Sequence, residues 1–356
     1  MYFFLSLFIF WERIPTDTKV NRSIGVTVLI PVRNEEKTIA RLLNAINNQC
    51  FPMYLLEVLV IDDHSEDNTL EEVNQVSKQV KYSLKTIKLQ KDQYGKKIAS
   101  TIGNQHAKFD LILCTDADTV PGEDWVSLMT GKLSEGQMKM VSGPVMMHGS
   151  SVLEQLQILE FSGLIGFGAI SIYLDRPTMC NGANMAYHKQ AFAHVGGYMN
   201  NLHIATGDDE FLLRKIEAEF PGQIGFVKTR QAIVSTSAKS TVQELWVQRI
   251  RWISKWNLHR SLRVYLLSIV SFSWFAGLGW FLVSLLIKEP LALLISWSVL
   301  FVSLVSFLRA TNQFFGNKVS YWLYMLLLLI YPYYAVVLGI ASIFGSYSWK
   351  GRQYSR

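Results

Sequence analysis

The sequence contains 356 residues, half of them hydrophobic, and carries a formal net charge of +6. This length allows one large domain and an additional region. The charge is unevenly distributed, because the part from Val264 onward has six basic residues and one acid, whereas the part before it has 28 basic and 27 acidic residues. The larger part is therefore nearly neutral, and we expect no nucleic-acid partner. The cysteines Cys50, Cys114 and Cys180 are far apart and indicate neither a zinc site nor a disulfide framework.

Residues 1–24 are predicted to form a short apolar anchor and a linker. Residues 1–11 are apolar, but a helix that crosses a membrane needs about 20 such residues. Two interpretations remain open: an interfacial anchor with Trp11 at the level of the lipid headgroups, or part of a longer membrane-spanning helix. Residues 16–24 are polar and are typical of a linker.

Residues 25–240 are predicted to form one α/β domain. Apolar stretches predict four buried strands, at residues 26–32, 55–61, 84–89 and 111–115. Helices are predicted to follow the first three strands, because Asn34, the segment 65–68 and Gly95 are suitable helix starts. Strands and helices that alternate at this spacing indicate a doubly wound, mostly parallel sheet flanked by helices.

The later part of this domain is less regular. It is predicted to contain a strand, a helix, a loop that enters a strand, and a second helix, at residues 138–145, 152–159, 181–187 and 206–219. Residues 161–173 are apolar, rich in glycine and too short to span a membrane. They either pack inside the domain or lie against the bilayer, and we favour the bilayer because apolar segments follow.

The C-terminal third is predicted to associate with a membrane. Residues 241–263 form a predicted amphipathic helix that mixes tryptophans with arginines and lysines, which suits a cytoplasmic membrane surface. Residues 264–348 form a predicted transmembrane region, and residues 349–356 a basic tail. The transmembrane region contains three apolar segments, at residues 264–287, 291–308 and 321–344.

Six aspartates follow predicted strands or open a predicted helix, in three pairs: Asp62 and Asp63, Asp116 and Asp118, and Asp208 and Asp209. The carboxyl ends of parallel strands meet at one edge of a sheet, where open α/β folds bind their ligands. Three acidic pairs at one edge would repel one another unless cations and phosphates lie between them. A bound Mg2+ or Mn2+ is therefore expected. Taken alone, Asp116-Ala117-Asp118 fits a surface turn equally well.

The order of these motifs resembles that of the family-two glycosyltransferases, nucleotide-sugar enzymes with a GT-A fold. The matching segments are residues 28–35, the aspartate-rich turn 61–69, Gly95-Lys96, Asp116-Ala117-Asp118, residues 206–210 and Gln248-Arg249-Ile250-Arg251-Trp252. The sequence is most similar to the membrane-embedded branch of cellulose, chitin and hyaluronan synthases, from about Val26 to Arg352. This resemblance implies a GT-A catalytic domain followed by transmembrane helices.

The resemblance implies a binding site for a nucleotide-sugar donor. Asp63 would accept a hydrogen bond from the uracil ring, and Asp62 and Glu35 would contribute to the same site. Lys96 would meet the diphosphate, although a solvated lysine at a helix start is nearly as reasonable an interpretation.

The resemblance also implies the groups that act on the sugar. Asp116 and Asp118 would hold Mg2+ or Mn2+ at the diphosphate, with Asp116 also close to the donor. Asp209, beside Asp208, would remove the proton from the acceptor hydroxyl as the new bond forms.

A last set of residues would serve the acceptor side. Gln248, Arg251 and Trp252 lie at positions i, i+3 and i+4, so a helix would present them on one face. Arg251 would stabilise charge on the leaving diphosphate, and Trp252 would offer a flat surface to the acceptor sugar. Asn184 and Tyr187 fall where relatives contact the acceptor.

These features predict an inverting glycosyltransferase that transfers a sugar from a nucleotide-diphosphate sugar, with a UDP-sugar favoured, to a hydroxyl of a membrane-associated lipid or glycan and forms a β-linkage. A processive synthase of a cell-envelope polysaccharide is the alternative, and an inactive membrane protein that binds nucleotide sugars is a third. We expect an integral protein of the inner or plasma membrane with a cytosolic catalytic domain. A homo-oligomer or an accessory subunit is left open.

Overall fold

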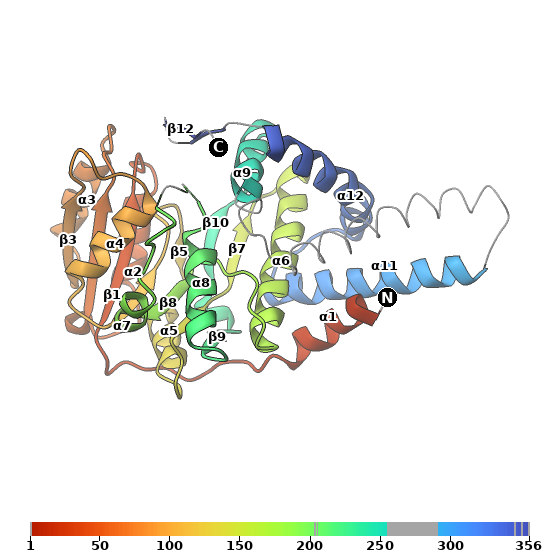
Figure 1. The fold of residues 1–356 in the computed structure, drawn as a ribbon, viewed down its shortest axis with the longest axis horizontal. Coiled ribbons are helices and arrows are strands. Elements are labelled where there is room, and N and C mark those ends of the chain that lie inside the picture. Colours follow the sequence, from red (N-terminus) through yellow and green to blue (C-terminus); the bar gives the residue numbers. More distant parts are fainter. Residues whose placement is uncertain are drawn as a thin grey trace. The chain divides into compact units, whose positions relative to one another are not determined.

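The computed structural model describes residues 2–202, 204, 206–254, 291–344, 347–349 and 352–354 of the chain. The chain divides into two compact units. The helical unit comprises Met1–Arg13, Gly149–Gly163 and Lys239–Arg356, and the sheet unit comprises Ile14–His148 and Leu164–Ala238. Figure 1 labels their helices and strands.

A seven-stranded sheet forms the centre of the sheet unit. In spatial order its strands are β3 (Ser83–Lys88), β2 (Leu56–Asp62), β1 (Val26–Val32), β4 (Leu111–Cys114), β8 (Met185–His188), β6 (Met140–Ser142) and β9 (Ile224–Phe226). All neighbours are parallel except β8, which is antiparallel to both β4 and β6. The predicted α/β class with a mostly parallel sheet is therefore confirmed.

A second, three-stranded sheet contains β5 (Val120–Pro121), β10 (Val234–Ser237) and β7 (Val145–His148). The prediction of one strand at residues 138–145 was wrong, because the chain leaves the large sheet after β6 and enters the small sheet at β7. Pro144 lies between them and has no N–H to donate to a strand partner.

One face of the large sheet packs on three helices, α2 (Ile39–Asn47), α3 (Thr69–Ser77) and α5 (Trp125–Leu133). Their apolar side chains share one buried cluster with alternating residues of the strands, such as Val28 and Val58. Alternation is expected because successive strand side chains point to opposite faces.

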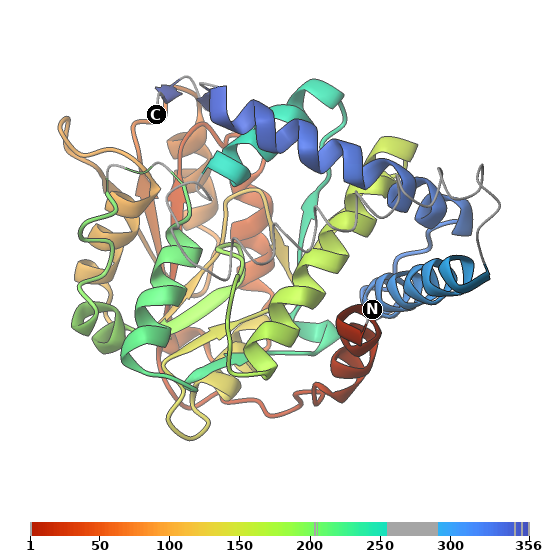
Figure 2. The same cartoon turned by 45° about the vertical axis from the view of Figure 1, so that its right-hand side comes forward.

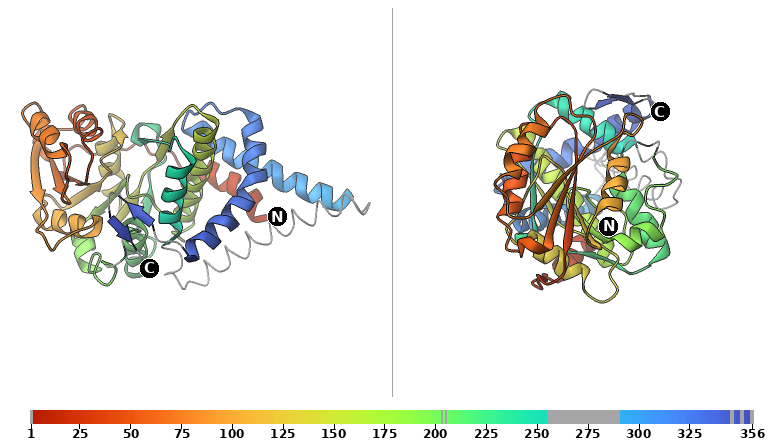
Figure 3. Two further views of the ribbon diagram at one scale, coloured as in Figure 1. Left: turned by 90° about the horizontal axis from the view of Figure 1, so that it is seen from above. Right: turned by 90° about the vertical axis from the view of Figure 1, so that its left-hand side faces the viewer.

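The other face of the sheet packs on α4 (Lys96–His106), and Figure 3 shows helices on both sides. At Gly103 an added Cβ would lie 3.0 Å from Ile61 Cδ1 and 3.1 Å from Leu29 Cδ2. The absence of a side chain at Gly103 lets α4 pack closely on β1 and β2.

The first predicted helix starts later than expected. Asn34 is not its N-cap, because α2 begins at Ile39 and Asn34 has a φ of 52°. The side-chain oxygen of Asn34 accepts a hydrogen bond from Glu66 N, and Asn34 N donates to Ser65 Oγ. Asn34 therefore links two loops at the ends of β1 and β2.

Among its described residues, the sheet unit contains four further helical elements. They are η1 (Met53–Leu55), α7 (Lys189–His194), α8 (Asp208–Glu219) and η2 (Arg230–Ala232). Helix α8 starts after Gly207, whose φ of 77° lies in the left-handed region that favours glycine.

Residues 152–173 form one helix, α6 (Val152–Tyr173), where the sequence predicted a helix at 152–159 and a separate apolar segment at 161–173. The glycines of this segment do not interrupt the helix. Gly168 packs closely, since an added Cβ would lie 3.1 Å from Met179 Cγ. An 18-residue apolar window in α6 is 67% buried, which favours packing inside the protein over the bilayer position that we had preferred.

The helical unit contains, besides the start of α6, α1 (Tyr2–Arg13), α9 (Val242–Ser254), α11 (Leu291–Phe314), α12 (Tyr321–Phe344) and the pair β11 (Tyr347–Trp349) and β12 (Arg352–Tyr354). Helix α1 lies beside α11 (Figure 2). Trp11 is 1% exposed and its ring contacts Phe314 edge-on, so protein rather than lipid headgroups covers it.

Among the described residues, two helical stretches are long and apolar enough to cross a membrane: α6 and Tyr321–Ala341 of α12. The α12 stretch is 22% buried. The predicted segment 291–308 lies within α11, whereas 264–287 and the end of the predicted helix 241–263 lie outside the described residues.

Candidate active site

The turn after β2 carries the first acidic pair. Asp62 ends β2 and its Oδ1 accepts a hydrogen bond from Ser65 N at 3.2 Å. Asp63 Oδ2 accepts a hydrogen bond from Gly95 N at 2.9 Å, and both aspartates are buried. Gly95 directly precedes α4, so Asp63 connects the end of β2 to the start of that helix.

Arg33, to which the sequence assigned no role, supports the same turn. Its Nη1 donates to the carbonyl oxygens of Asp63 and His64 at 2.8 Å each, and its Nη2 lies 3.0 Å from Glu66. Only its position after β1 hinted at this role. Glu35, further along the loop, accepts a hydrogen bond from Thr38 Oγ1 at 2.7 Å, and its contact with a substrate stays a prediction.

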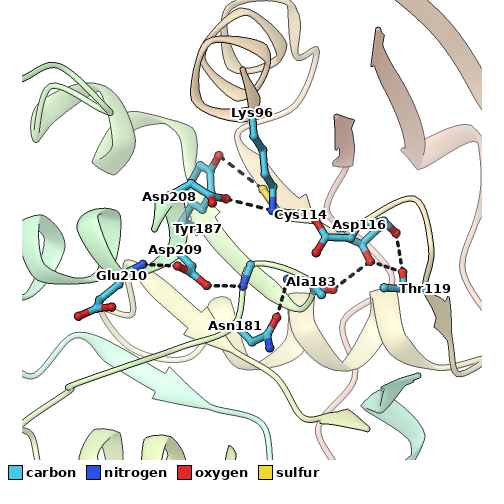
Figure 4. Close-up of polar contacts among 12 residues, drawn as sticks. Lys96, Cys114, Asp116, Thr119, Asn181, Ala183, Tyr187, Asp208, Asp209 and Glu210 are labelled. Atoms are coloured by element: carbon cyan, nitrogen blue, oxygen red, sulfur yellow. Dashed lines mark hydrogen bonds and ion pairs between the residues drawn. The ribbon is translucent and has the colours of Figure 1, made fainter. Parts of the chain in front are cut away.

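Lys96 joins the second and third acidic pairs. Its Nζ lies 2.7 Å from Asp116 Oδ1 and 3.1 Å from Asp208 Oδ2 (Figure 4). Asp116 follows β4 and Asp208 opens α8, so three elements meet at one cation. Asp116, after β4, and Asp208 therefore lie close together, as the sequence predicted.

Asp209 lies beside this ion pair. Its Oδ1 accepts a hydrogen bond from Glu210 N at 2.8 Å, and its Oδ2 accepts one from Gly182 N at 3.1 Å. An added Cβ at Gly182 would lie 3.2 Å from Lys96 Nζ and 3.3 Å from Asp208 Oδ2. Gly182 therefore lets the loop before β8 reach the acids. Only its place in the predicted loop 181–187 could have pointed to it. We call Lys96, Asp116, Gly182, Asp208 and Asp209 the lysine–acid cluster.

The charges in this cluster compensate one another. Burial alone would lower the pKa of Lys96, but attraction to Asp116, then Asp208 and Asp209, raises it well above its usual value. Lys96 is therefore a permanent cation at neutral pH, and it offsets the repulsion expected between the acids.

The donor set at β4 fits a divalent cation that is shared with a substrate. Asp116 and Asp118 lie one residue apart and both are partly exposed. Within the part of the chain that the structure describes, no group of three or more His, Cys, Asp or Glu side chains is arranged to hold a metal. Mg2+ and Mn2+ accept one or two carboxylates when water and phosphate supply their other ligands.

Asn184 and Tyr187 do not have the places that the sequence predicted. Asn184 is 0% exposed; its Nδ2 donates to the carbonyls of Pro144 and Ala232, and its Oδ1 accepts from Trp125 Nε1. Tyr187 is also 0% exposed and its hydroxyl accepts a hydrogen bond from Asn104. Because these side chains are buried and hydrogen-bonded inside the fold, their predicted contact with the acceptor was wrong.

The predicted acceptor residues of the C-terminal motif lie on α9 in the helical unit. Gln248, Arg251 and Trp252 share this helix, as the spacing requires, and their roles stay predictions. Arg249, which the sequence left unassigned, is 2% exposed and lies 2.7 Å from Glu160. Its guanidinium lies 4.2 Å from the Trp252 ring centroid and donates to Gln248 Oε1.

Open α/β folds bind their ligands at the carboxyl ends of the strands, and the lysine–acid cluster lies beside the end of β4. Residues 27–196 match the family described as Glycosyl transferase family 2. Residues 27–196 thus resemble a domain of this family, and this match and the curated relatives support a glycosyltransferase.

Two curated relatives illustrate the similarity. Glycosyltransferase AglE of Haloferax volcanii is 27% identical over 198 residues, which cover 55% of this chain and 62% of AglE. Poly-beta-1,6-N-acetyl-D-glucosamine synthase of Staphylococcus aureus is 26% identical over 242 residues, which cover 66% of this chain and 55% of the synthase. The matches thus span a little more than half of the length of these relatives.

A solved structure supports the fold. The mannosyltransferase PcManGT from Pyrobaculum calidifontis, in complex with GDP-Man and Mn2+, aligns with a TM-score of 0.57 and 18% identity, over 96% of this chain and 92% of that chain. At this identity the likeness shows the GT-A fold.

Proposed function

We propose that this chain is an inverting glycosyltransferase that moves a sugar from a UDP-sugar to a hydroxyl of a membrane-associated lipid or glycan and forms a β-linkage. The observation that carries the proposal is the lysine–acid cluster, in which Lys96 lies within 3.1 Å of both Asp116 and Asp208. The GDP-Man and Mn2+ named for PcManGT agree with a nucleotide-sugar donor and a divalent metal. The polysaccharide named for the staphylococcal relative agrees with a glycan acceptor.

The donor would be held at the start of α4, between the turn after β2 and Lys96. Asp62 and Asp63 would meet the nucleotide base, and Lys96 would exchange its contact with Asp116 for the donor diphosphate. Asp116 and Asp118 would hold Mg2+ or Mn2+, which supplies charge stabilisation for the leaving diphosphate when bound.

Asp209 would act as the general base. Two backbone N–H groups orient its carboxylate, so its direction does not depend on a flexible partner. The acceptor hydroxyl would lose its proton to Asp209 as its oxygen bonds to the sugar carbon, while the bond to the diphosphate breaks on the opposite side. A single displacement of this kind inverts the configuration at that carbon.

The membrane part of the proposal rests on α12 and the apolar segments of the sequence. An exposed row of apolar side chains along α12 suits contact with lipid: Trp322, Met325, Leu329, Tyr333, Val336 and Ile340. We infer that α12 lies in an inner or plasma membrane and that the sheet unit faces the cytosol, where nucleotide sugars are available to it.

A processive synthase is the alternative, and the motif on α9 together with the staphylococcal relative favours it. Product length distinguishes the two: a ladder of products indicates polymerisation, and one discrete species indicates single transfer.

The experiment that tests the function uses purified protein in nanodiscs with Mn2+ and a panel of UDP- and GDP-sugars. Release of the nucleoside diphosphate is measured for the wild type, Asp118→Asn and the control Asp92→Asn, an exposed residue before α4. We expect the wild type and Asp92→Asn to release UDP from a UDP-sugar, and we expect Asp118→Asn to have lost this release. If the protein binds the donor but neither releases the nucleoside diphosphate nor transfers sugar in the presence of membrane extract, the result would favour an inactive membrane protein that binds nucleotide sugars.

A further inference from the structure

Lys97, the neighbour of Lys96, is buried in an unusual place for a lysine. It is 3% exposed, and its Nζ donates hydrogen bonds to the carbonyl oxygens of Asn201 and Ile204 at 2.9 Å each. A buried ammonium group is costly unless hydrogen-bond acceptors surround it. The two carbonyls lie in the stretch that leads to α8.

The same ammonium group also contacts the start of α8. Its Nζ lies 4.3 Å from the ring centroid of Phe211, which is in the first turn of that helix. Lys97 therefore contacts the chain on both sides of Asp208 and Asp209. Lys96, on the adjacent face of α4, holds Asp208 itself.

A second lysine holds the earlier part of the stretch. Lys215 of α8 donates from its Nζ to the carbonyl oxygens of Gly197 at 2.7 Å and Met199 at 2.8 Å. The described residues of the segment 197–207, here called the clamped loop, form no helix or strand. Two ammonium groups thus fix four carbonyls of an otherwise irregular loop.

The clamped loop is exposed on its outer side, since Met199 is 65% and Leu202 48% exposed. Buried Tyr198, whose ring packs on Phe192, anchors the start of the loop, and the carbonyls of Asn201 and Ile204 nearer to α8 are held by Lys97. A displacement of the loop would also displace Asp209, because only a few residues separate Ile204 from the start of α8.

We propose that Lys97 is a positioning residue that fixes the clamped loop and thereby aims Asp209 at the acceptor hydroxyl. This inference rests on the proposed role of Asp209 as general base. Lys97 acts through backbone carbonyls and Phe211, so its removal changes the transfer step and leaves the binding of the nucleotide unchanged. Displacing a catalytic group by about 1 Å lowers rates by up to about a hundredfold.

The test compares Lys97→Met, Lys97→Arg and the control Lys189→Met in nanodiscs. Lys189 also donates from Nζ to a backbone carbonyl, that of Ala107 at 2.8 Å, but at the other end of α4. For each variant we would measure kcat for transfer, the Kd for UDP, and hydrogen exchange of peptides that cover the clamped loop.

The expected result for Lys97→Met is a fall in kcat of about ten- to a hundredfold, a Kd for UDP within about twofold of the wild type, and faster exchange in the clamped loop. Lys97→Arg, which keeps the charge and the donors, should recover part of the rate. Lys189→Met should keep both the rate and the exchange of the loop.

Two results would overturn the proposal. One is a wild-type kcat in Lys97→Met; the other is a parallel loss of UDP binding and rate, which would indicate a general structural role. Wild type and Asp209→Asn are measured in the same assay. If the wild type and Asp209→Asn transfer sugar at the same rate, the proposed function fails. Hydrogen exchange of the clamped loop still measures whether Lys97 fixes that loop.

Discussion

The Nζ atom of Lys96 lies 2.7 Å from a carboxylate oxygen of Asp116, and this ion pair joins the start of α4 to the end of β4. The same ammonium group reaches Asp208 at 3.1 Å. The acids at this sheet edge are therefore neutralised in part by the protein itself. Lys96 is therefore already placed to contact a donor diphosphate in this site.

Replacement of Lys96 should weaken the use of the donor. Lys96→Met removes the cation that faces the diphosphate, so we expect the KM for the nucleotide sugar to rise by about tenfold or more, because a charge-assisted hydrogen bond contributes about 1.5–3 kcal/mol. Steady-state kinetics with varied donor would measure it. Lys91→Met, an exposed lysine before α4, is the matched control. An unchanged KM in Lys96→Met would exclude contact with the diphosphate.

Glu57 should make the fold sensitive to acid. Its buried carboxylate accepts hydrogen bonds from Lys85 Nζ at 2.8 Å, Lys108 N at 2.7 Å and Thr27 Oγ1 at 2.9 Å. Burial alone would raise the pKa of Glu57, but the hydrogen bond from Lys85 and those from Lys108 and Thr27 lower it below its usual 4.5. Glu57→Gln should reduce the free energy of unfolding by about 2 kcal/mol at neutral pH.

The sign of the pH effect follows from the lowered pKa of Glu57. The stabilisation is complete above the unfolded-state pKa and is lost as the pH falls through the lower, folded-state value. Urea unfolding of the wild type and Glu57→Gln from neutral pH to below pH 4.5 would measure it. A difference between them that does not shrink in acid would contradict this assignment.

Asn184 should be a structural residue. Asn184→Ala leaves the buried carbonyls of Pro144 and Ala232 and the indole N–H of Trp125 without a hydrogen-bond partner. We expect a loss of about 3 kcal/mol in the free energy of unfolding. Thermal unfolding measures this, with the exposed residue change Asn74→Ala as control. Full stability combined with a raised acceptor KM would restore the original acceptor prediction.

The cysteines should differ in reactivity. Cys50 is exposed, whereas Cys114 is buried beside the lysine–acid cluster, and burial raises the pKa of its thiol to about 12. Only thiolates react rapidly with maleimides, so Cys50 should be labelled in the native protein at about pH 8 and Cys114 only after unfolding. Mass spectrometry of labelled peptides would test this. Rapid native labelling of Cys114 would contradict its burial.

The sequence predicted the parallel core because its signals there are local. β1 was predicted with the bounds that it has, and Gly95 was recognised as the residue before α4. Apolar runs of strand length and glycine at a helix start need no knowledge of distant residues.

The features that the sequence missed depend on distant partners. Asn34 starts no helix because Ser65 and Glu66 bind it, and Asn184 is structural because Trp125 and Pro144 lie beside it. Nothing in the spacing of these residues reports such contacts. The continuous α6 was missed because glycines suggest a break in a helix, although burial among close neighbours permits them.

The sequence predicted which residues form the site more completely than how these residues pair. The motif order pointed to Lys96, Asp116, Asp208 and Asp209, but pairing Lys96 with two acids required the geometry. Arg249, one residue after Gln248, stacks on Trp252 and pairs with Glu160, a contact between residues 89 apart in the chain.

The anomeric configuration of the product reports directly on the proposed single displacement. Sugar transferred by the purified protein from its α-linked nucleotide sugar, in the presence of membrane extract and Mn2+, would be analysed by NMR for the wild type and Asp209→Asn. A single displacement with Asp209 as its base gives a β-linked product from the wild type and, from Asp209→Asn, a transfer rate lower by about a hundredfold or more. An α-linked product, or undiminished transfer by Asp209→Asn, would contradict a single displacement with Asp209 as its base.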